Sequence, residues 1–308
     1  SFIYITLLCV AFYSAVFPFI QYAPDLLVNK FGFMYDLPKD SSVVVFGSEA
    51  LGNALVYITV FLFAIGVTVV PNNMKSNSQK LILRLVLIVV FVFLIILNWE
   101  MLSIWLSNGP KTSALIPLGT IIFTPIFGNI VDTKGKAASL MMLGALLLIF
   151  AHLALSLTST PIFAYLGLLS LGIAFSLVPA AMWPSVAKIV AENRLGTAYS
   201  TMFTVQNWGL GLFFWGIGAL LTVVNPTVVE DLRNARQSFE AEGYSAGEIS
   251  DIVKEMQIAG ELPYYDYTIP ILVLVACGLI SIFLAYKLKQ ADKRQGYGLE
   301  LPSSEKPE

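Results

Sequence analysis

Long apolar runs separated by short polar stretches make up most of this chain. A helix that spans a bilayer needs about 20 consecutive apolar residues, because the hydrocarbon core is about 30 Å thick. Eight runs meet this requirement: residues 2–22, 47–70, 81–106, 112–131, 137–157, 161–188, 197–224 and 268–288. The pattern predicts an all-α integral membrane protein of about eight spans, with a membrane domain over residues 1–290.

Two polar stretches lie outside these runs. Residues 225–267 are rich in Asp and Glu, and their pattern predicts two short helices near 227–241 and 246–258. Ser245 and Glu248 have the spacing of a capping box, which starts a helix. We interpret 225–267 as an external acidic helical loop that caps the membrane domain, with a docking surface for a partner as the alternative. Residues 291–308 are predicted to be a disordered cytoplasmic tail.

The distribution of Lys and Arg predicts the orientation in the membrane. If the turn at 132–136 is cytoplasmic, twelve of the 18 Lys and Arg residues, with Lys306 among them, lie inside, and six, with Lys39 among them, lie outside. Cytoplasmic loops carry the excess of positive charge in membrane proteins. Both ends of this chain are therefore predicted to be cytoplasmic.

Composition excludes several other classes of protein. The chain is 57% hydrophobic and 12% charged, whereas about 25% charge is typical of soluble domains. A net charge of −2 gives no indication of a nucleic-acid partner. The two cysteines, Cys9 and Cys277, and the single histidine, His152, each lie within an apolar run, so we predict no disulfide framework, metal site or cofactor. We expect His152 to be a packed side chain rather than a proton carrier.

A short charged turn joins the runs 112–131 and 137–157. Its sequence is Gly128-x-x-x-Asp132-x-x-Gly135-Lys136, and such a short turn makes the two helices an antiparallel hairpin. Gly128 is expected to let two helices approach closely, and Asp132 to accept hydrogen bonds from a neighbouring helix N-terminus. Gly135 supplies backbone freedom and Lys136 a cation. The pattern resembles the signature loop of the major facilitator superfamily, where it joins the second and third helices of a six-helix half.

Further stretches resemble one branch of that superfamily, which includes a lysosomal dipeptide uniporter of animals and related bacterial carriers. They are the Trp-Pro pair at 183–184, Leu-Gly-Thr-Ala-Tyr at 195–199, Gln-Asn-x-Gly at 206–209, and residues 15–20 and 30–33. The resemblance implies that the chain is the C-terminal half of the fold, with 47–106 as an inserted transmembrane hairpin. Since the first residue is Ser, we expect that residue 1 is not the natural start. The partners that the resemblance implies are therefore the lipid bilayer and the missing N-terminal half of the same protein.

Polar and aromatic residues within the spans are the candidates for a substrate site, since polar groups in lipid are costly unless they are paired or face a cavity. Tyr13, Phe17 and Gln21 recur on one face of the first helix. The prolines at 179 and 184 are expected to break or kink their helix and free backbone carbonyls. The predicted substrate-binding residues are Tyr13, Phe17, Gln21, Trp183, Tyr199, Gln206 and Asn207. For Gln206 and Asn207, hydrogen bonding between helices is an equal alternative.

The function that the resemblance implies is secondary transport of a small polar solute, such as a di- or small peptide, by alternating access. We identify no buried carboxylate or Arg in the six spans, so either the N-terminal half supplies ion coupling or transport is uncoupled. A membrane enzyme of lipid-linked sugar metabolism and a transporter-fold scaffold are the alternatives, but no catalytic motif supports an enzyme. The only Asn-x-Thr with a glycosylation spacing, at 225–227, is blocked by Pro226. This favours a bacterial inner membrane over a lysosomal or other organelle membrane.

Overall fold

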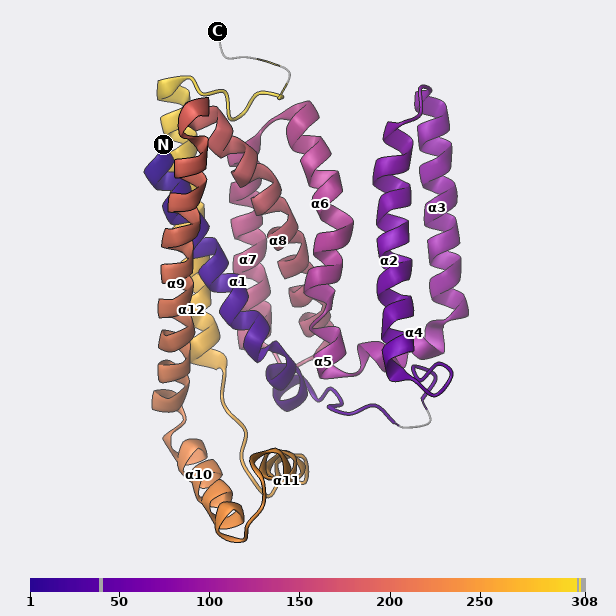
Figure 1. Cartoon of the computed structure of the whole chain (residues 1–308), viewed down its shortest axis with the longest axis vertical. Helices are drawn as coiled ribbons and strands as arrows, with labels where there is room; N and C mark the ends of the chain where they lie inside the picture. Colours follow the sequence, from indigo (N-terminus) through magenta and orange to yellow (C-terminus); the bar gives the residue numbers. More distant parts are fainter. Residues whose placement is uncertain (39–40, 304, 306–308) are drawn as a thin grey trace.

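Eight membrane-length helices dominate the computed structural model, which describes residues 1–38, 41–303 and 305 (Figure 1). They are α1 (Phe2–Phe31), α2 (Glu49–Asn72), α3 (Asn77–Leu97), α6 (Leu115–Lys134), α7 (Ala137–Leu157), α8 (Pro161–Ile189), α9 (Leu195–Val224) and α12 (Thr268–Gln295). Short elements connect them: α4 (Trp99–Leu106), α5 (Gly109–Thr112), η1 (Glu192–Arg194), α10 (Pro226–Ala241) and α11 (Ala246–Ile258). The predicted all-α membrane fold of eight spans is confirmed.

Six of the long helices form one bundle. Helix α7 packs on α8 and α12, α8 packs on α6, and α1 packs on α12 and α9. Close approach between α6 and α8 depends on two glycines, since a Cβ added at Gly119 would lie 3.1 Å from the Cα of Gly172. Lipid tails are as apolar as the side chains, so helices associate in a membrane through such close packing.

Helix α1 is nine residues longer than the predicted span 2–22. It continues through Pro18 and Pro24 and ends at Phe31, where Gly32 adopts a left-handed conformation with φ 73°. The prediction stopped too early because the polar residues around Pro24 look like a helix end. In the structure, Asp25 and Lys30 find partners on other elements, so the helix extends past them.

Helices α2 and α3 form a hairpin beside the bundle (Figure 1). Helix α2 packs on α6, whereas α3 packs mainly on α2 and has no buried residue. The predicted span 81–106 is divided, because α3 ends at Leu97 and the short α4 follows. One long face of the hairpin is therefore left to lipid.

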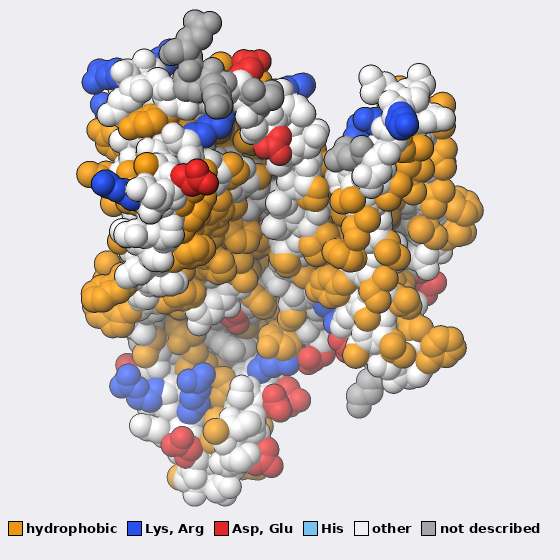
Figure 2. Space-filling view, turned by 45° about the horizontal axis from the view of Figure 1, so that its top comes forward, with side chains coloured by type: hydrophobic (Ala, Val, Ile, Leu, Met, Phe, Trp, Pro, Cys, Tyr) orange, Lys and Arg blue, Asp and Glu red, His pale blue; other side chains and the backbone are white. Residues whose placement is uncertain are grey.

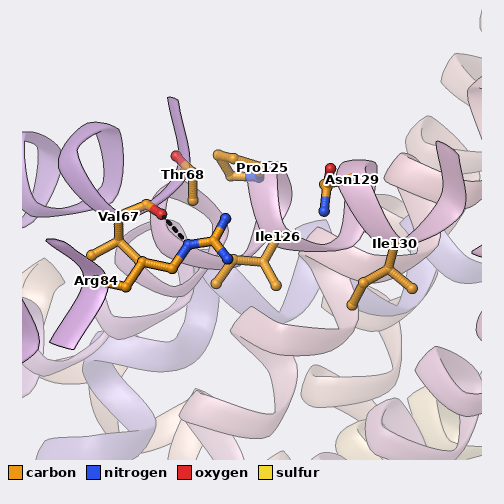
Figure 3. Close-up of a pocket in the computed structure, with 7 residues that line it drawn as sticks. All are labelled: Val67, Thr68, Arg84, Pro125, Ile126, Asn129 and Ile130. Atoms are coloured by element: carbon orange, nitrogen blue, oxygen red, sulfur yellow. Dashed lines mark hydrogen bonds between the residues drawn. The ribbon is translucent and has the colours of Figure 1, made fainter. Parts of the chain in front are cut away.

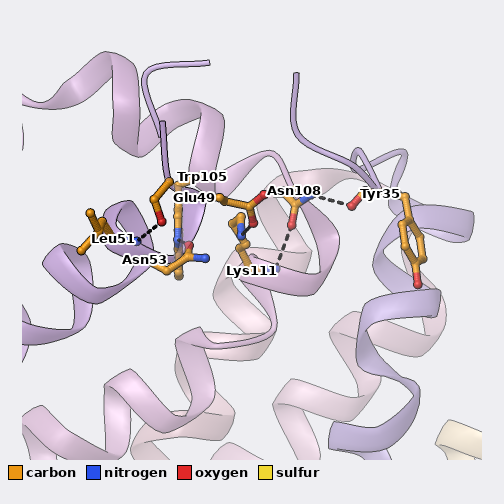
Figure 4. A network of polar contacts seen from close by, with 8 residues as sticks. Tyr35, Glu49, Leu51, Asn53, Trp105, Asn108 and Lys111 are labelled. Carbon is orange, nitrogen blue, oxygen red and sulfur yellow. Dashed lines mark hydrogen bonds and ion pairs between the residues drawn. The ribbon is translucent and has the colours of Figure 1, made fainter. Parts of the chain in front are cut away.

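A network of polar contacts ties one end of this hairpin to the rest of the chain (Figure 4). Lys111 forms an ion pair with Glu49 at the start of α2. The Trp105 indole N–H donates to Asn53 Oδ1 at 3.0 Å, and the Asn108 amide donates to the Tyr35 carbonyl at 2.7 Å. Because each contact joins α2 or the segment after α1 to the α4–α5 region, the hairpin is fixed at this end.

The acidic loop forms the two predicted helices, α10 and α11, on the opposite side from the hairpin turn (Figure 1). The capping box at Ser245 and Glu248 is confirmed, with the Ser245 N–H donating to Glu248 Oε2 at 2.9 Å. A small apolar core holds the two helices together; its buried members are Val228, Leu232, Ile249 and Val253. On α11, Lys254 pairs with Asp36 at 3.2 Å and so links this loop to the segment after α1.

The predicted disordered tail is wrong for residues 291–303. Helix α12 continues to Gln295, and Leu299 is fully buried. The polar composition suggested disorder, but main-chain groups of this stretch bind other helices, as described below. The remaining part of the predicted tail includes Ser304 and residues 306–308, which lie outside the described residues.

Both ends of the described chain lie on one side of the bundle. Figure 1 shows residue 1, the end of α12, the α2–α3 turn and the α6–α7 turn at the top, and α10 with α11 at the bottom. Figure 2 shows basic side chains at the top of the hairpin and of the bundle, and others in the lower part of the view. Of the residues counted for the orientation, Lys39 and Lys306 lie outside the described residues. The arrangement agrees with alternating spans, and which side is cytoplasmic stays a prediction from the Lys and Arg distribution.

This orientation predicts opposite accessibility for two exposed positions, Lys134 and Ser250. In a variant of the full-length protein without Cys9 and Cys277, Ser250→Cys should react with a membrane-impermeant thiol reagent from outside. Lys134→Cys should react only after the membrane is permeabilised. Reaction of both cysteines in intact cells would contradict the orientation.

Candidate functional site

Six aromatic side chains from three helices form a continuous group, which we call the aromatic cluster: Tyr13 and Phe17 of α1, Phe175 and Trp183 of α8, and Tyr199 and Phe203 of α9. The rings of Tyr13 and Phe17 are stacked with centroids 5.6 Å apart, and Phe175 meets both edge-on. Trp183 stacks on Phe203 at 4.7 Å. Sequence analysis identified four of these residues; Phe175 and Phe203 were missed because isolated phenylalanines in apolar runs carry no pattern.

Two hydrogen bonds fix the cluster at its centre. The Trp183 indole N–H donates to Tyr13 Oη at 3.2 Å, and Tyr199 Oη donates to the Trp183 carbonyl at 3.1 Å. The first bond joins α8 to α1, and the second joins α9 to α8. Trp183, Tyr199 and Phe17 are only partly buried, so the cluster presents apolar faces and polar edges at the bundle surface.

Helix α8 is continuous through Pro179 and Pro184, so of the two predicted outcomes, a break or a kink, the break is wrong. A proline lacks the N–H that would bind the carbonyl four residues earlier. The carbonyls of Phe175 and Ala180 are therefore released from the helical ladder without an end to the helix. Both positions lie within or near the aromatic cluster.

The structure separates the other predicted polar residues. Gln206 is buried between α9 and α1, where its Oε1 accepts from the Cys9 thiol at 3.1 Å. Asn207 and Gln21 are exposed. Gln206 and Asn207 point to different surroundings because neighbours in a helix are about 100° apart. In this conformation Gln206 joins two helices, which is the alternative that sequence analysis left open.

Asp25 is a carboxylate that sequence analysis placed outside the spans. It lies in the last third of α1 and accepts a hydrogen bond from the Tyr267 hydroxyl, just before α12. Burial and then the Asp25 charge raise the pKa of Tyr267, so this hydroxyl keeps its proton. The apolar run from Leu26 to Val28, followed by Gly32 as a helix-ending residue, is the signal that places Asp25 within a helix.

His152 is fully buried, and its two ring nitrogens lie 2.8 Å from the Leu148 carbonyl and 3.1 Å from the Ala15 carbonyl. The Phe19 ring packs edge-on against it. The imidazole thus links α7 to α1, as expected of a packed histidine.

The turn after α6 requires an unusual backbone. Gly135 has φ 69° and ψ −131°, a region open essentially to glycine, and Lys136 follows in the left-handed conformation. A Cβ on Gly135 would also lie 2.4 Å from the Leu301 carbonyl carbon. By contrast, a Cβ on Gly128 would meet no described atom within 4 Å, so the predicted close helix contact at Gly128 is absent from this conformation.

The chain after α12 binds this turn, and we call residues 298–303 the C-terminal segment. Within the described part of the chain, the bonds of Asp132 go to Ser303 and not to the predicted helix N-terminus: its Oδ1 accepts from Ser303 Oγ at 3.0 Å, and its carbonyl accepts from the Ser303 N–H at 2.9 Å. The Lys136 and Ala137 N–H groups donate to the carbonyls of Glu300 and Leu299. The first orphan N–H groups of α7 are thereby satisfied.

Side chains hold the C-terminal segment from two more helices. Lys188 of α8 donates to the carbonyls of Gly298 and Leu301 at 3.0 and 2.9 Å. Glu300 accepts from the Ser139 N–H and hydroxyl at 3.0 and 2.6 Å, and lies 3.2 Å from the Lys289 ammonium. The C-terminal segment therefore connects the turn after α6 to α7, α8 and α12.

Comparison with known proteins supports the resemblance found in the sequence. The chain is 34% identical over 100 residues to "Lysosomal dipeptide transporter MFSD1" of Danio rerio, which covers 32% of this chain and 21% of the relative. For the proteins of the same name in Homo sapiens and Mus musculus, identity is 34% over 98 residues and 31% over 157 residues. The Homo sapiens match covers 32% of this chain and 21% of the relative, and the Mus musculus match covers 48% and 33%. The chain thus spans about a fifth to a third of these relatives, and no family model matches it.

Glu300 should stabilise the fold in a pH-dependent way. Burial by itself would raise the pKa of its carboxyl, but the Ser139 hydrogen bonds and Lys289 outweigh burial and hold the pKa below its ordinary value of 4.5. A lowered folded-state pKa gives a stabilisation that is present above the ordinary value and lost as the pH falls through the folded-state pKa. Glu300→Gln should cost about 1–2 kcal/mol at neutral pH.

Thermal melts of the purified full-length protein at several pH values measure this effect. The melting temperature of Glu300→Gln should be lower than that of the wild type at pH 7, and the difference should disappear well below pH 4.5. Glu305→Gln, which removes the same charge from an exposed position nearby, is the control. An equal loss of stability in both variants would show that the Ser139 contacts contribute nothing specific.

Proposed function

We propose that this chain forms part of a secondary transporter that moves small polar solutes of the dipeptide class across the membrane by alternating access. The observation that carries the proposal is the aromatic cluster, where α1, α8 and α9 meet, in a chain similar to proteins named lysosomal dipeptide transporters. The names of those relatives describe transporters rather than enzymes.

The depth of the cluster supports a role in the transport path. Tyr13 lies eleven residues into α1, which at 1.5 Å per residue is roughly 17 Å, about half of a 30 Å core. Substrate sites of secondary transporters lie near the bilayer midplane, between structural repeats. The partly buried faces of Phe17, Trp183 and Tyr199 would contact a ligand at that depth, and the rest of the full-length protein would enclose it.

The chemistry of the cluster suits a small peptide. Aromatic faces accommodate varied side chains, while the Tyr13 hydroxyl can donate to a ligand carbonyl and the Tyr199 oxygen can accept from a ligand N–H. The Trp183 indole N–H is already bound to Tyr13. The two released carbonyls of α8, at Phe175 and Ala180, are acceptors for peptide N–H groups. We assign the charged ends of the peptide to partners outside this cluster, which contains no charged side chain.

The turn after α6 would serve the conformational change. Alternating access needs two arrangements of the helices whose populations depend on a few differential contacts. The contacts of Asp132, Lys136 and Ala137 with the C-terminal segment join α6 and α7 to α8 and α12 on one side of the membrane. We infer that these contacts help to hold the conformation described here.

Trp183→Ala should weaken transport of dipeptides by the full-length protein in proteoliposomes. Loss of the indole face that would contact the ligand should reduce apparent affinity about 5- to 10-fold, since an aromatic contact contributes about 0.5–1.5 kcal/mol beyond its buried area. Trp99→Ala removes an equal ring from an exposed position on α4 and serves as the control. If the Trp183→Ala protein folds and keeps wild-type affinity, the aromatic cluster is not part of the transport path.

Asp132→Asn should alter transport more than stability. The Asn amide oxygen can still accept from Ser303 Oγ, but the charge that strengthens this exposed bond is lost. A weakening of about 0.5–1.5 kcal/mol in one conformation shifts a two-state equilibrium by about 2- to 12-fold. Ser303→Ala removes the side-chain bond altogether and should change the transport rate in the same direction. Normal rates in both variants, measured at equal expression, would exclude this contact from the conformational change.

A further inference from the structure

A partly open groove lies between the α2–α3 hairpin and the six-helix bundle, and its volume is about 240 Å³. Three helices line it: α2 with Val67 and Thr68, α3 with Arg84, and α6 with Pro125, Ile126, Asn129 and Ile130 (Figure 3). The wall is mostly apolar. The groove lies toward the α2–α3 turn, at the end of the hairpin opposite to the polar network of Figure 4.

Among the described residues, Arg84 is the only charged one that lines this groove. Its Nε donates to the Val67 carbonyl at 3.2 Å, and within the described part of the chain no hydrogen bond or ion pair engages its two terminal nitrogens. Figure 3 shows the guanidinium extended from α3 toward Ile126 of α6. It therefore offers N–H donors inside the groove while the Nε bond fixes its direction.

The depth of Arg84 makes an anionic partner favourable. It lies seven residues after the start of α3, roughly 10 Å along the helix, on the side predicted to be cytoplasmic. A cation at this depth costs free energy unless an anion or water accompanies it. No carboxylate lines the groove, whereas the cytoplasmic leaflet of many membranes supplies anionic phosphates at this level.

We propose that the groove binds an anionic phospholipid of the cytoplasmic leaflet. The terminal N–H groups of Arg84 hold the phosphate in a bidentate contact, and the Asn129 amide is a second donor within reach of the headgroup. An acyl chain lies against Val67, Ile126 and Ile130. A lipid fits better than a soluble anion, because the groove is apolar apart from these donors and lies between membrane-spanning helices.

Such a lipid would join the hairpin to the bundle at the end where protein contacts are few. It would also lie against Pro125, which leaves the Ile121 carbonyl without its helical donor and so weakens α6 at this point. Helix α6 ends in the turn that binds the C-terminal segment. The lipid site is independent of the proposed transport function, and binding alone tests it.

Native mass spectrometry of the purified full-length protein, titrated with phosphatidylglycerol or phosphatidylcholine, measures occupancy directly. Wild type should retain phosphatidylglycerol in preference to phosphatidylcholine. Arg84→Gln, which removes the phosphate donors, and Ile126→Trp, which fills the groove and keeps the charge, should each reduce phosphatidylglycerol binding at least 5-fold. Lys75→Gln, which removes the same charge from the exposed α2–α3 turn, should leave it unchanged.

Three results would overturn the site. Equal loss of phosphatidylglycerol in Arg84→Gln and Lys75→Gln would mean that general surface charge binds the lipid. Unchanged binding in Ile126→Trp, with a cooperative thermal melt, would place the lipid outside the groove. If Arg84→Gln lowers the melting temperature equally in both lipids and binding is unchanged, an acidic side chain of the full-length protein pairs with Arg84 and the lipid proposal fails.

Discussion

Every backbone N–H and C=O within the bilayer must find a partner inside the protein, and the rest of this structure depends on that constraint. It makes the spans helical and leaves side-chain packing to decide how they associate. Gly119 and Gly172 show the consequence, since α6 and α8 approach until backbone meets backbone. Where the constraint is relaxed, at Pro179 and Pro184, the released carbonyls lie beside the aromatic cluster that we assign to the substrate path.

Many polar interactions lie at the two ends of the helices. At one end they are mainly between side chains, and at the other they involve main-chain groups of one segment. On the side of α10 and α11, side chains join separate pieces of chain, as in the Lys111–Glu49 pair and the Tyr267–Asp25 bond. On the other side, a single stretch, the C-terminal segment, supplies main-chain groups to four helices at once. One short segment can thus influence the turn after α6 and the end of α8 together, which suits a region that has to respond when the helices move.

The hairpin follows a different rule from the bundle. Its outer helix, α3, buries nothing, and its inner helix, α2, contacts α6 alone among the bundle helices to any large extent. The hairpin is attached firmly at one end and has the groove with Arg84 at the other, where we propose that it responds to the surrounding lipid. The exposed apolar face of α3 would be unfavourable in water, and in a membrane the lipid tails cover it.

The sequence by itself determined the number of spans, the two helices of the acidic loop and the capping box, because these depend on local hydrophobic runs and on neighbours three or four residues apart. It also identified four members of the aromatic cluster, Tyr13 and Phe17 from their spacing on one helix face and Trp183 and Tyr199 from stretches that resemble known transporters. The tertiary structure alone decided that α1 continues past Pro24, that Gln206 faces Cys9, and that Asp132 and Glu300 bind partners about 160 to 170 residues away in the chain. Those outcomes depend on contacts between distant segments. A polar residue near a helix end is read as loop or tail until the partner that satisfies it is known.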